Sequence, residues 1–280
     1  MANSKSMREL VTAVSKELKI ARDEAELVVA TLMNRPRFEL YISEELGGNE
    51  KDAIWSKVRK LREGMPIEYV TQRVQFRDRV LKIRPGVFIP RLETEYFVEI
   101  IPKISAHAPE RILEIGTGCG AISIALAGFF PRARIVATDI SRLALDNAAD
   151  NIVGCGLESR ISLVQCSMFE GLTGKFDLVV SNPPYVPSSR MNDLPVSVRE
   201  FEPLAAIDGG AEGLEFIKKI ILGSPDHLSR TGVVALEIDE ESVKALKRFL
   251  VERNIPSYAF RRDLFNKYRY FFTGAINEKS

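Results

Sequence analysis

The stretch Arg111-Ile-Leu-Glu-Ile-Gly-Thr-Gly-Cys-Gly-Ala-Ile122 joins a short apolar run to a glycine-rich turn and then to a helical pattern. From here onward, apolar runs alternate with helical segments, which is typical of a parallel sheet with helices on both faces. We expect strands at residues 111–115, 134–138, 161–165, 176–181 and 233–238, and helices at 121–129, 142–152, 214–222 and 241–254. The aromatic segments 258–261 and 268–273 are expected to close the sheet as an antiparallel pair. The sequence therefore predicts an α/β fold.

The residues before this α/β region carry a different pattern. Apolar side chains recur at helical spacing in three stretches, residues 10–18, 25–32 and 49–62. The alternating segment Val74–Ile83 then predicts a β-hairpin. We therefore divide the chain into a small helical N-terminal domain (1–72), a hairpin connector (73–90) and the α/β domain (91–280).

Composition excludes several classes of protein. The 280 residues are 45% hydrophobic and 28% charged with a net charge of +1, so no global field draws the chain to nucleic acid or to an anionic membrane. The longest apolar run, Ala121–Phe130, is too short to cross a bilayer, and the N-terminus lacks the apolar core of a secretory signal. With three cysteines, no C-x-x-C and two histidines, we expect a reduced, cytoplasmic protein without a metal site.

The glycine-rich turn and an acidic residue beyond it indicate a nucleoside pocket. Gly116, Gly118 and Gly120 allow a sharp turn and the close approach of a ligand. Nineteen residues after Gly120, at the end of the next expected strand, Asp139 can accept hydrogen bonds from both ribose hydroxyls of an adenosine. Gly116, Gly118 and Ala121 also fit the dinucleotide fingerprint, so at this point NAD and S-adenosylmethionine both remain open.

The segment Asn182-Pro-Pro-Tyr185 favours S-adenosylmethionine over NAD. A dehydrogenase usually needs a His, Lys or Tyr acid for hydride transfer, and no residue is placed for that role, whereas this segment suits methyl transfer to an amide or amine. It follows the expected strand 176–181, and open α/β sheets bind ligands beyond the carboxyl ends of their strands. The Asn182 side-chain oxygen and the Pro183 carbonyl can hold the two N–H bonds of an amide or exocyclic amine, which orients a weak nucleophile for attack. The same two acceptors stabilise the positive charge that develops on nitrogen. Tyr185 is expected to pack on the flat face of the target group.

At this point the chain resembles a known family, the glutamine N5-methyltransferases of peptide-chain release factors, over most of its length. The residues that carry the resemblance are Gly64-Met-Pro-Ile-Glu-Tyr69, Phe88-Ile-Pro-Arg-Leu-Glu-Thr-Glu95, Leu113–Ile122, Ala137-Thr-Asp-Ile-Ser141, Ala144-Leu-Asp-Asn-Ala148, Val180–Val186, Phe201-Glu-Pro-Leu-Ala205 and Asp208-Gly-Gly210. The glycine motif and the Asn-Pro-Pro-Tyr motif are shared with other methyltransferases, whereas Ile-Pro-Arg-x-Glu-Thr-Glu is more specific. Leu92, Ser167-Met168 and Glu237–Glu240 depart from the family pattern.

The resemblance implies a seven-stranded, Rossmann-like class I methyltransferase domain behind a helical domain that grips the substrate. The implied cofactor is S-adenosyl-L-methionine, which becomes S-adenosyl-L-homocysteine, and the implied substrate is the glutamine of a release factor's Gly-Gly-Gln loop. The implied cofactor-binding residues are Gly116, Thr117, Gly118, Cys119, Gly120, Asp139, Met168 and Asn182. The implied substrate-binding residues are Arg91, Glu93, Asn182, Pro183, Pro184 and Tyr185, with Asn182, Pro183 and Tyr185 in the catalytic role.

Three alternatives use the same residues differently. Glutamine methylation of a ribosomal protein needs the same amide geometry. N6-adenine methylation of nucleic acid also needs it, but enzymes of that kind usually carry a basic surface. The basic and aromatic residues between Arg261 and Tyr270 are instead interpreted as an edge hairpin, so we do not expect direct nucleic-acid binding. A non-catalytic binding module has little use for an intact Asn182 and Tyr185.

Overall fold

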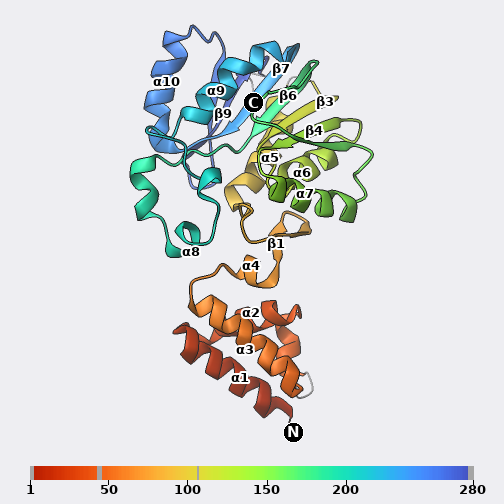
Figure 1. Ribbon diagram of the computed structural model, residues 1–280, viewed down its shortest axis with the longest axis vertical. Coiled ribbons are helices and arrows are strands. Elements are labelled where there is room, and N and C mark those ends of the chain that lie inside the picture. Colours follow the sequence, from red (N-terminus) through yellow and green to blue (C-terminus); the bar gives the residue numbers. More distant parts are fainter. Residues whose placement is uncertain (1–2, 43–45, 106, 277–280) are drawn as a thin grey trace. The chain divides into compact units, whose positions relative to one another are not determined.

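The computed structural model describes residues 3–42, 46–105 and 107–276, which form the helices and strands drawn in Figure 1. The chain divides into two compact units. The first consists of residues 1–73 together with 196–201, and the second of residues 74–195 together with 202–280.

The first unit is helical, as the sequence predicts. Its elements are α1 (Asn3–Leu18), α2 (Arg22–Met33), η1 (Arg37–Tyr41), α3 (Gly48–Arg62), α4 (Ile67–Thr71) and α8 (Val196–Arg199). Val14, Val29 and Val58 are fully buried and lie in one apolar cluster with contributions from α1, α2 and α3. The helical periodicity of these stretches therefore builds a small core of its own.

The second unit contains a seven-stranded sheet with the order β5-β4-β3-β6-β7-β9-β8. Its strands are β3 (Arg111–Ile115), β4 (Arg134–Asp139), β5 (Ile161–Gln165), β6 (Phe176–Ser181), β7 (Leu228–Glu237), β8 (Tyr258–Arg262) and β9 (Tyr268–Gly274). Strands β3 to β7 pair in parallel, and β9 pairs antiparallel with both β7 and β8. The predicted α/β fold and the closing antiparallel pair are confirmed. Strand β7 begins five residues earlier than expected, because the polar residues before Val233 resemble a loop.

Helices cover both faces of this sheet (Figure 1). On one face, α9 (Glu215–Gly223) and α10 (Val243–Glu252) pack on buried side chains of β3, β6, β7 and β9. The other α-helices of this unit are α5 (Leu92–Ile104), α6 (Ala121–Phe129) and α7 (Arg142–Gly154). Helix α5 was not among the expected helices, although Phe97, Val98 and Ile101 are buried at helical spacing. None of the helices in the described ranges is long and apolar enough to cross a membrane.

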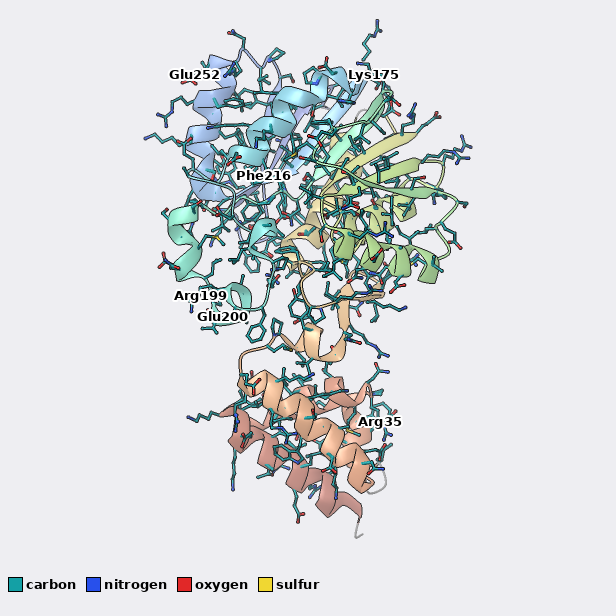
Figure 2. The ribbon with its side chains drawn as sticks, in the orientation of Figure 1. Arg35, Lys175, Arg199, Glu200, Phe216 and Glu252 are labelled. Atoms are coloured by element: carbon teal, nitrogen blue, oxygen red, sulfur yellow. The ribbon has the colours of Figure 1, made fainter. Side chains whose placement is uncertain are left out.

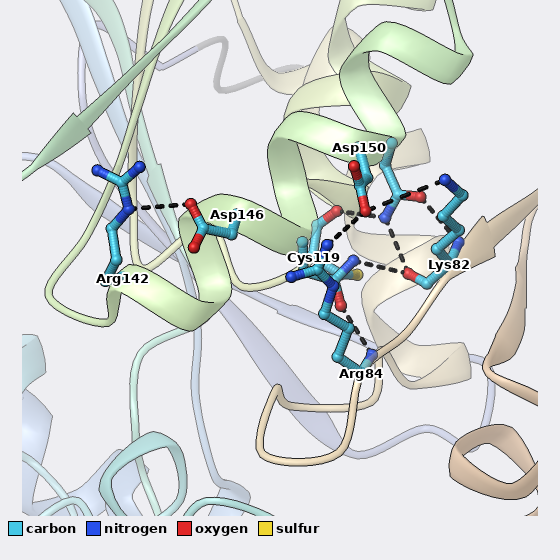
Figure 3. A network of polar contacts seen from close by, with 8 residues as sticks. Lys82, Arg84, Cys119, Arg142, Asp146 and Asp150 are labelled. Carbon is cyan, nitrogen blue, oxygen red and sulfur yellow. Dashed lines mark hydrogen bonds and ion pairs between the residues drawn. The ribbon is translucent and has the colours of Figure 1, made fainter.

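A two-stranded sheet, β1 (Arg73–Phe76) and β2 (Arg79–Lys82), occupies the segment where the sequence predicts a hairpin. Two buried amides of α7 hold the end of β2. Figure 3 labels Lys82, Arg84 and Cys119, which take part in this network. Asn151 Oδ1 accepts from the Lys82 N–H at 2.7 Å, and Asn147 Oδ1 accepts from the Arg84 N–H at 2.8 Å. Asn151 Nδ2 also donates to the Cys119 carbonyl at 2.9 Å, so the same side chain reaches the glycine-rich turn.

Candidate active site

A cavity of about 310 Å³ lies at the carboxyl ends of β3, β4 and β6, within the second unit. Its walls come from the glycine-rich turn, the ends of three strands and the segment after β6. Side chains of α5 and α9 also line it, among them Phe216, which Figure 2 labels on α9. Further parts of the lining come from the segments 86–90, 166–168 and 203–206. This is the place where parallel α/β sheets bind their ligands.

The glycine-rich turn leaves open space on its cavity side. Gly116 and Gly118 have positive φ angles of 74° and 56°, and a Cβ added at either position would meet no atom within 4 Å. The turn is fixed to β4, because the Thr117 N–H donates to the Thr138 carbonyl at 2.8 Å. A ligand can therefore lie directly against this backbone.

Asp139 ends β4 beside the turn. One carboxylate oxygen accepts from the Gly118 N–H and the other from the Ser141 N–H, both at 2.9 Å. The N-cap of α7 is Ser141, whose hydroxyl accepts from the Ala144 N–H, so Asp139 is not needed for capping. Burial raises the pKa of Asp139 above its usual value. A carboxylate has about four acceptor positions, which leaves capacity for ligand hydroxyls.

Glu114 at the end of β3 is a fully buried carboxylate that the sequence analysis did not single out. Its Oε2 accepts from Thr117 Oγ1 at 2.8 Å and from the N–H and hydroxyl of Ser123. Its Oε1 has no hydrogen-bond partner among the described residues, although Glu114 lines the cavity. Burial raises the pKa of Glu114 to about 7. The available signal was a single acid among the apolar residues 112–115 of the expected strand.

The segment after β6 presents Asn182 to the cavity. Asn182 is half-buried, and its Nδ2 donates to Thr94 Oγ1 of α5 at 3.2 Å. Ser181 holds the end of β6 to β3, because its hydroxyl donates to the Ile115 carbonyl at 2.7 Å. With its nitrogen engaged by Thr94, Asn182 can offer its side-chain oxygen as an acceptor to a ligand in the cavity.

The backbone of this segment packs against a second glycine-rich stretch. The Val186 N–H donates to the Ile207 carbonyl, and the Gly209 N–H donates to the Val186 carbonyl at 2.8 Å. A Cβ at Gly209 would lie 2.7 Å from the Pro184 oxygen, which is closer than real Cβ contacts allow. The Asp208-Gly-Gly210 motif is therefore explained by the close approach of the two backbones.

The expected site residues do not all line this cavity. Those that do are Gly116, Thr117, Gly118, Cys119, Asp139, Met168, Asn182, Pro183 and Pro184. Met168 holds a left-handed backbone conformation with φ 53°. Gly120, Arg91, Glu93 and Tyr185 lie outside the lining, and Gly120 packs near Ala148 of α7.

Tyr185, Arg91 and Glu93 make contacts within the protein. The Tyr185 hydroxyl donates to Glu237 Oε1 at 3.0 Å. Arg91 forms an ion pair with buried Glu202, whose other oxygen accepts from the Ile89 N–H. The carbonyl of Glu93 accepts from the Tyr270 hydroxyl at 2.8 Å. Thr94, Glu202 and Glu237 were quoted within sequence motifs but were not expected as site residues, since their importance depends on partners that are distant along the chain.

Fold and site together define a class of protein. The sheet of seven strands is Rossmann-like, the glycine turn is followed by an acid on the next strand, and the Asn-Pro-Pro-Tyr segment lies at the cavity. Together these features define a class I methyltransferase. The family model described as methyltransferase small domain matches residues 82–196. The catalytic domain of hMettl16, solved with a MAT2A 3′UTR hairpin, has a TM-score of 0.56 at 18% identity, covering 84% of this chain and 85% of that one, and shows the fold alone.

Relatives with similar sequences identify the family within the class I methyltransferases. A release factor glutamine methyltransferase of Moorella thermoacetica is 36% identical over 259 residues, which is 89% of this chain and 91% of the relative. The MTRF1L release factor glutamine methyltransferase of Homo sapiens is 30% identical, covering 89% of this chain and 80% of the relative. The chain belongs to the release factor glutamine methyltransferase family, as the resemblance of its motifs predicts.

Proposed function

We propose that this protein transfers a methyl group from S-adenosylmethionine to the side-chain amide nitrogen of the glutamine in the Gly-Gly-Gln loop of a peptide-chain release factor, in the cytoplasm. The observation that carries the proposal is the hydrogen bond from Asn182 Nδ2 to Thr94, because it leaves Asn182 Oδ1 as an acceptor at the cavity. The names of the relatives at 36% and 30% identity support the choice of substrate.

The cavity fits S-adenosylmethionine by its donor and acceptor groups. Gly116 and Gly118 leave room for a ligand against the backbone. Asp139 keeps acceptor capacity for ribose hydroxyls, and the carboxylate of Glu114 places a negative charge at the cavity that suits a cationic amine. When bound, the cofactor supplies an electrophilic methyl group on a sulfonium sulfur.

The residues of the protein act on the amide. Asn182 Oδ1 and the Pro183 carbonyl accept the two N–H bonds of the glutamine and hold its nitrogen in place, and such orientation provides up to about 7–11 kcal/mol of rate enhancement. Methyl transfer makes the nitrogen cationic, and the two oxygens stabilise that charge. The nitrogen then loses one proton to solvent, which leaves a neutral N-methyl amide.

The test is a methylation assay with four substrates in parallel: a release factor, the same factor with its loop glutamine replaced by alanine, a ribosomal protein mixture, and DNA or RNA. Mass spectrometry locates any added methyl group. We expect one methyl group on the loop glutamine and none on the replaced factor. Transfer to a ribosomal protein or to nucleic acid, with the release factor left unmodified, would refute the proposal.

A further inference from the structure

Behind Asn182 lies a buried carboxylate that touches neither the cavity nor the glycine turn. Glu237 ends β7 and is fully buried. Its Oε2 accepts from Thr94 Oγ1 at 2.8 Å, and its Oε1 accepts from the Tyr185 hydroxyl at 3.0 Å. Thr94 belongs to α5 and Tyr185 to the segment after β6, so Glu237 joins two elements that flank Asn182.

The number of protons available fixes the direction of these hydrogen bonds. A threonine hydroxyl has one proton, and an ionised carboxylate can only accept. The Thr94 proton therefore goes to Glu237, and the Thr94 oxygen can only accept from Asn182. The NH₂ group of Asn182 must therefore face Thr94, in agreement with the 3.2 Å distance between Asn182 Nδ2 and Thr94 Oγ1. Asn182 Oδ1 then lies on the other side of the amide.

We infer that Glu237 and Thr94 form a positioning relay, in which Glu237 sets the hydroxyl of Thr94 and Thr94 holds the Asn182 amide with Oδ1 turned toward the substrate. The inference rests on the proposed function, since it assigns Oδ1 to the substrate amide. Neither Thr94 nor Glu237 reacts. If the side-chain amide of Asn182 were rotated by half a turn, its N–H groups would face the N–H groups of the glutamine, and the two sets of donors would repel each other.

The charge state of Glu237 controls the relay. When Glu237 is protonated, its hydroxyl can donate to Thr94, and the Thr94 proton is then free to turn to Asn182 Oδ1. Burial raises the pKa of Glu237 to about 7, and the nearby Glu93 carboxylate acts in the same direction. Hydrogen bonds from Thr94 and Tyr185 and the charge of Arg269 on β9 lower it.

Tyr270 on β9 is a further titratable group beside Glu237, and its pKa is raised by burial and by the carboxylates of Glu237 and Asp263. Burial also raises the pKa of the Tyr185 phenol, which therefore remains a donor over the working pH range. Glu237 is thus the group whose ionisation falls near neutrality in this network. Turnover is expected to fall as the pH drops below about 7.

The first test compares three threonine variants. Thr94→Val removes the hydroxyl at constant shape, and Thr94→Ser retains it. Thr273→Val is the matched control, because Thr273 is buried and its hydroxyl donates to the Ser257 carbonyl, away from the relay. We expect Thr94→Val to lower kcat about 10- to 100-fold, with KM for the release factor and the affinity for S-adenosylhomocysteine within about threefold. Thr94→Ser and Thr273→Val are expected to stay within about threefold of wild type.

The second test is a pH profile of kcat at saturating S-adenosylmethionine for wild type, Glu237→Gln and Glu114→Gln. Glu114→Gln is included because burial also raises the pKa of Glu114 to about 7, and it is expected to keep the wild-type transition. Wild-type turnover is expected to rise through pH of about 7. The Glu237→Gln variant is expected to be slow and free of this transition, since a glutamine cannot ionise. Wild-type turnover in Thr94→Val, or the same transition in Glu237→Gln, would overturn the relay.

A third measurement needs no substrate. The side-chain ¹⁵NH₂ signal of Asn182, assigned by its loss in Asn182→Ala, is expected to shift with pH through about 7 in wild type and to stay constant in Glu237→Gln. A pH-independent wild-type signal would refute the relay. If the release factor is not methylated by wild type, the proposed function fails alone, and this signal still decides the inference.

Discussion

Two buried glutamates lie on the two sides of the active site, and they are used differently. Glu114, beside the glycine turn, and Glu237, behind Asn182, are both fully buried, and burial raises the pKa of each to about 7. Glu114 has one oxygen without a partner and borders the cavity. Both oxygens of Glu237 accept hydrogen bonds from the protein. A carboxylate in the cavity lining can bind a ligand, whereas one outside the lining, such as Glu237, acts on a ligand only through its neighbours.

The largest expected effect is on the amide side. In the proposed function Asn182 Oδ1 holds the substrate nitrogen. Asn182→Ala removes this acceptor, so we expect kcat to fall about 1,000-fold, which corresponds to about 4 kcal/mol in the transition state. The affinity for S-adenosylhomocysteine, measured by calorimetry, is expected to stay within about threefold. If Asn182→Ala lowered only the affinity for the cofactor, Asn182 would belong with Glu114 to the cofactor side of the site. The division into a cofactor side and an amide side would then be wrong.

The pH dependence of stability sharpens the comparison next. A glutamate with a raised pKa in the folded state stabilises the fold below pH of about 4.5, and this stability is lost as the pH rises through about 7. For Glu237 the loss amounts to roughly 3 kcal/mol. We expect the unfolding free energy of wild type, from urea titrations, to fall more steeply over this range than that of Glu237→Gln. Parallel curves for the two proteins would contradict the burial of an ionising group.

A smaller effect is expected from Gly209→Ala, which tests whether the amide side depends on the close packing of two backbones. The new Cβ would lie 2.7 Å from the Pro184 oxygen, so that the segment must shift. We expect a loss of about 1–3 kcal/mol in stability and about tenfold in kcat. The control is Gly128→Ala on α6, where a Cβ meets nothing within 4 Å and stability is expected to be unchanged or higher. Equal turnover in both variants would contradict the role of Gly209.

The smallest expected effect is on the cofactor side. Glu114→Gln replaces the unpartnered acceptor with a neutral group, and we expect the affinity for S-adenosylhomocysteine to fall about tenfold, or about 1.4 kcal/mol. Glu237→Gln is the matched variant and is expected to keep this affinity within about twofold, because Glu237 does not reach the glycine turn. If both variants lose affinity equally, the two glutamates do not have separate tasks.

The sequence predicts much of this architecture because the decisive signals are local. The strand, glycine turn and helix over Arg111–Phe129 follow from neighbouring residues, and the predicted bounds match the observed ones. The start of β7 was predicted too late, because the polar residues at its start lack the apolar pattern by which a strand is recognised in the sequence. Helix α5 was overlooked behind the Pro-rich motif that precedes it, despite its helical spacing of buried residues.

What the sequence determined by itself is the Asn182-Pro-Pro-Tyr185 segment, the glycine turn and Asp139, since each lies at the end of a strand that its own neighbours specify. Only the tertiary structure decided which side chains support them. Thr94 is 88 positions from Asn182 and 143 from Glu237, and the three meet because α5 packs against the sheet. A hydrogen bond between such distant residues leaves no periodic pattern along the chain, so no local reading of the sequence detects it.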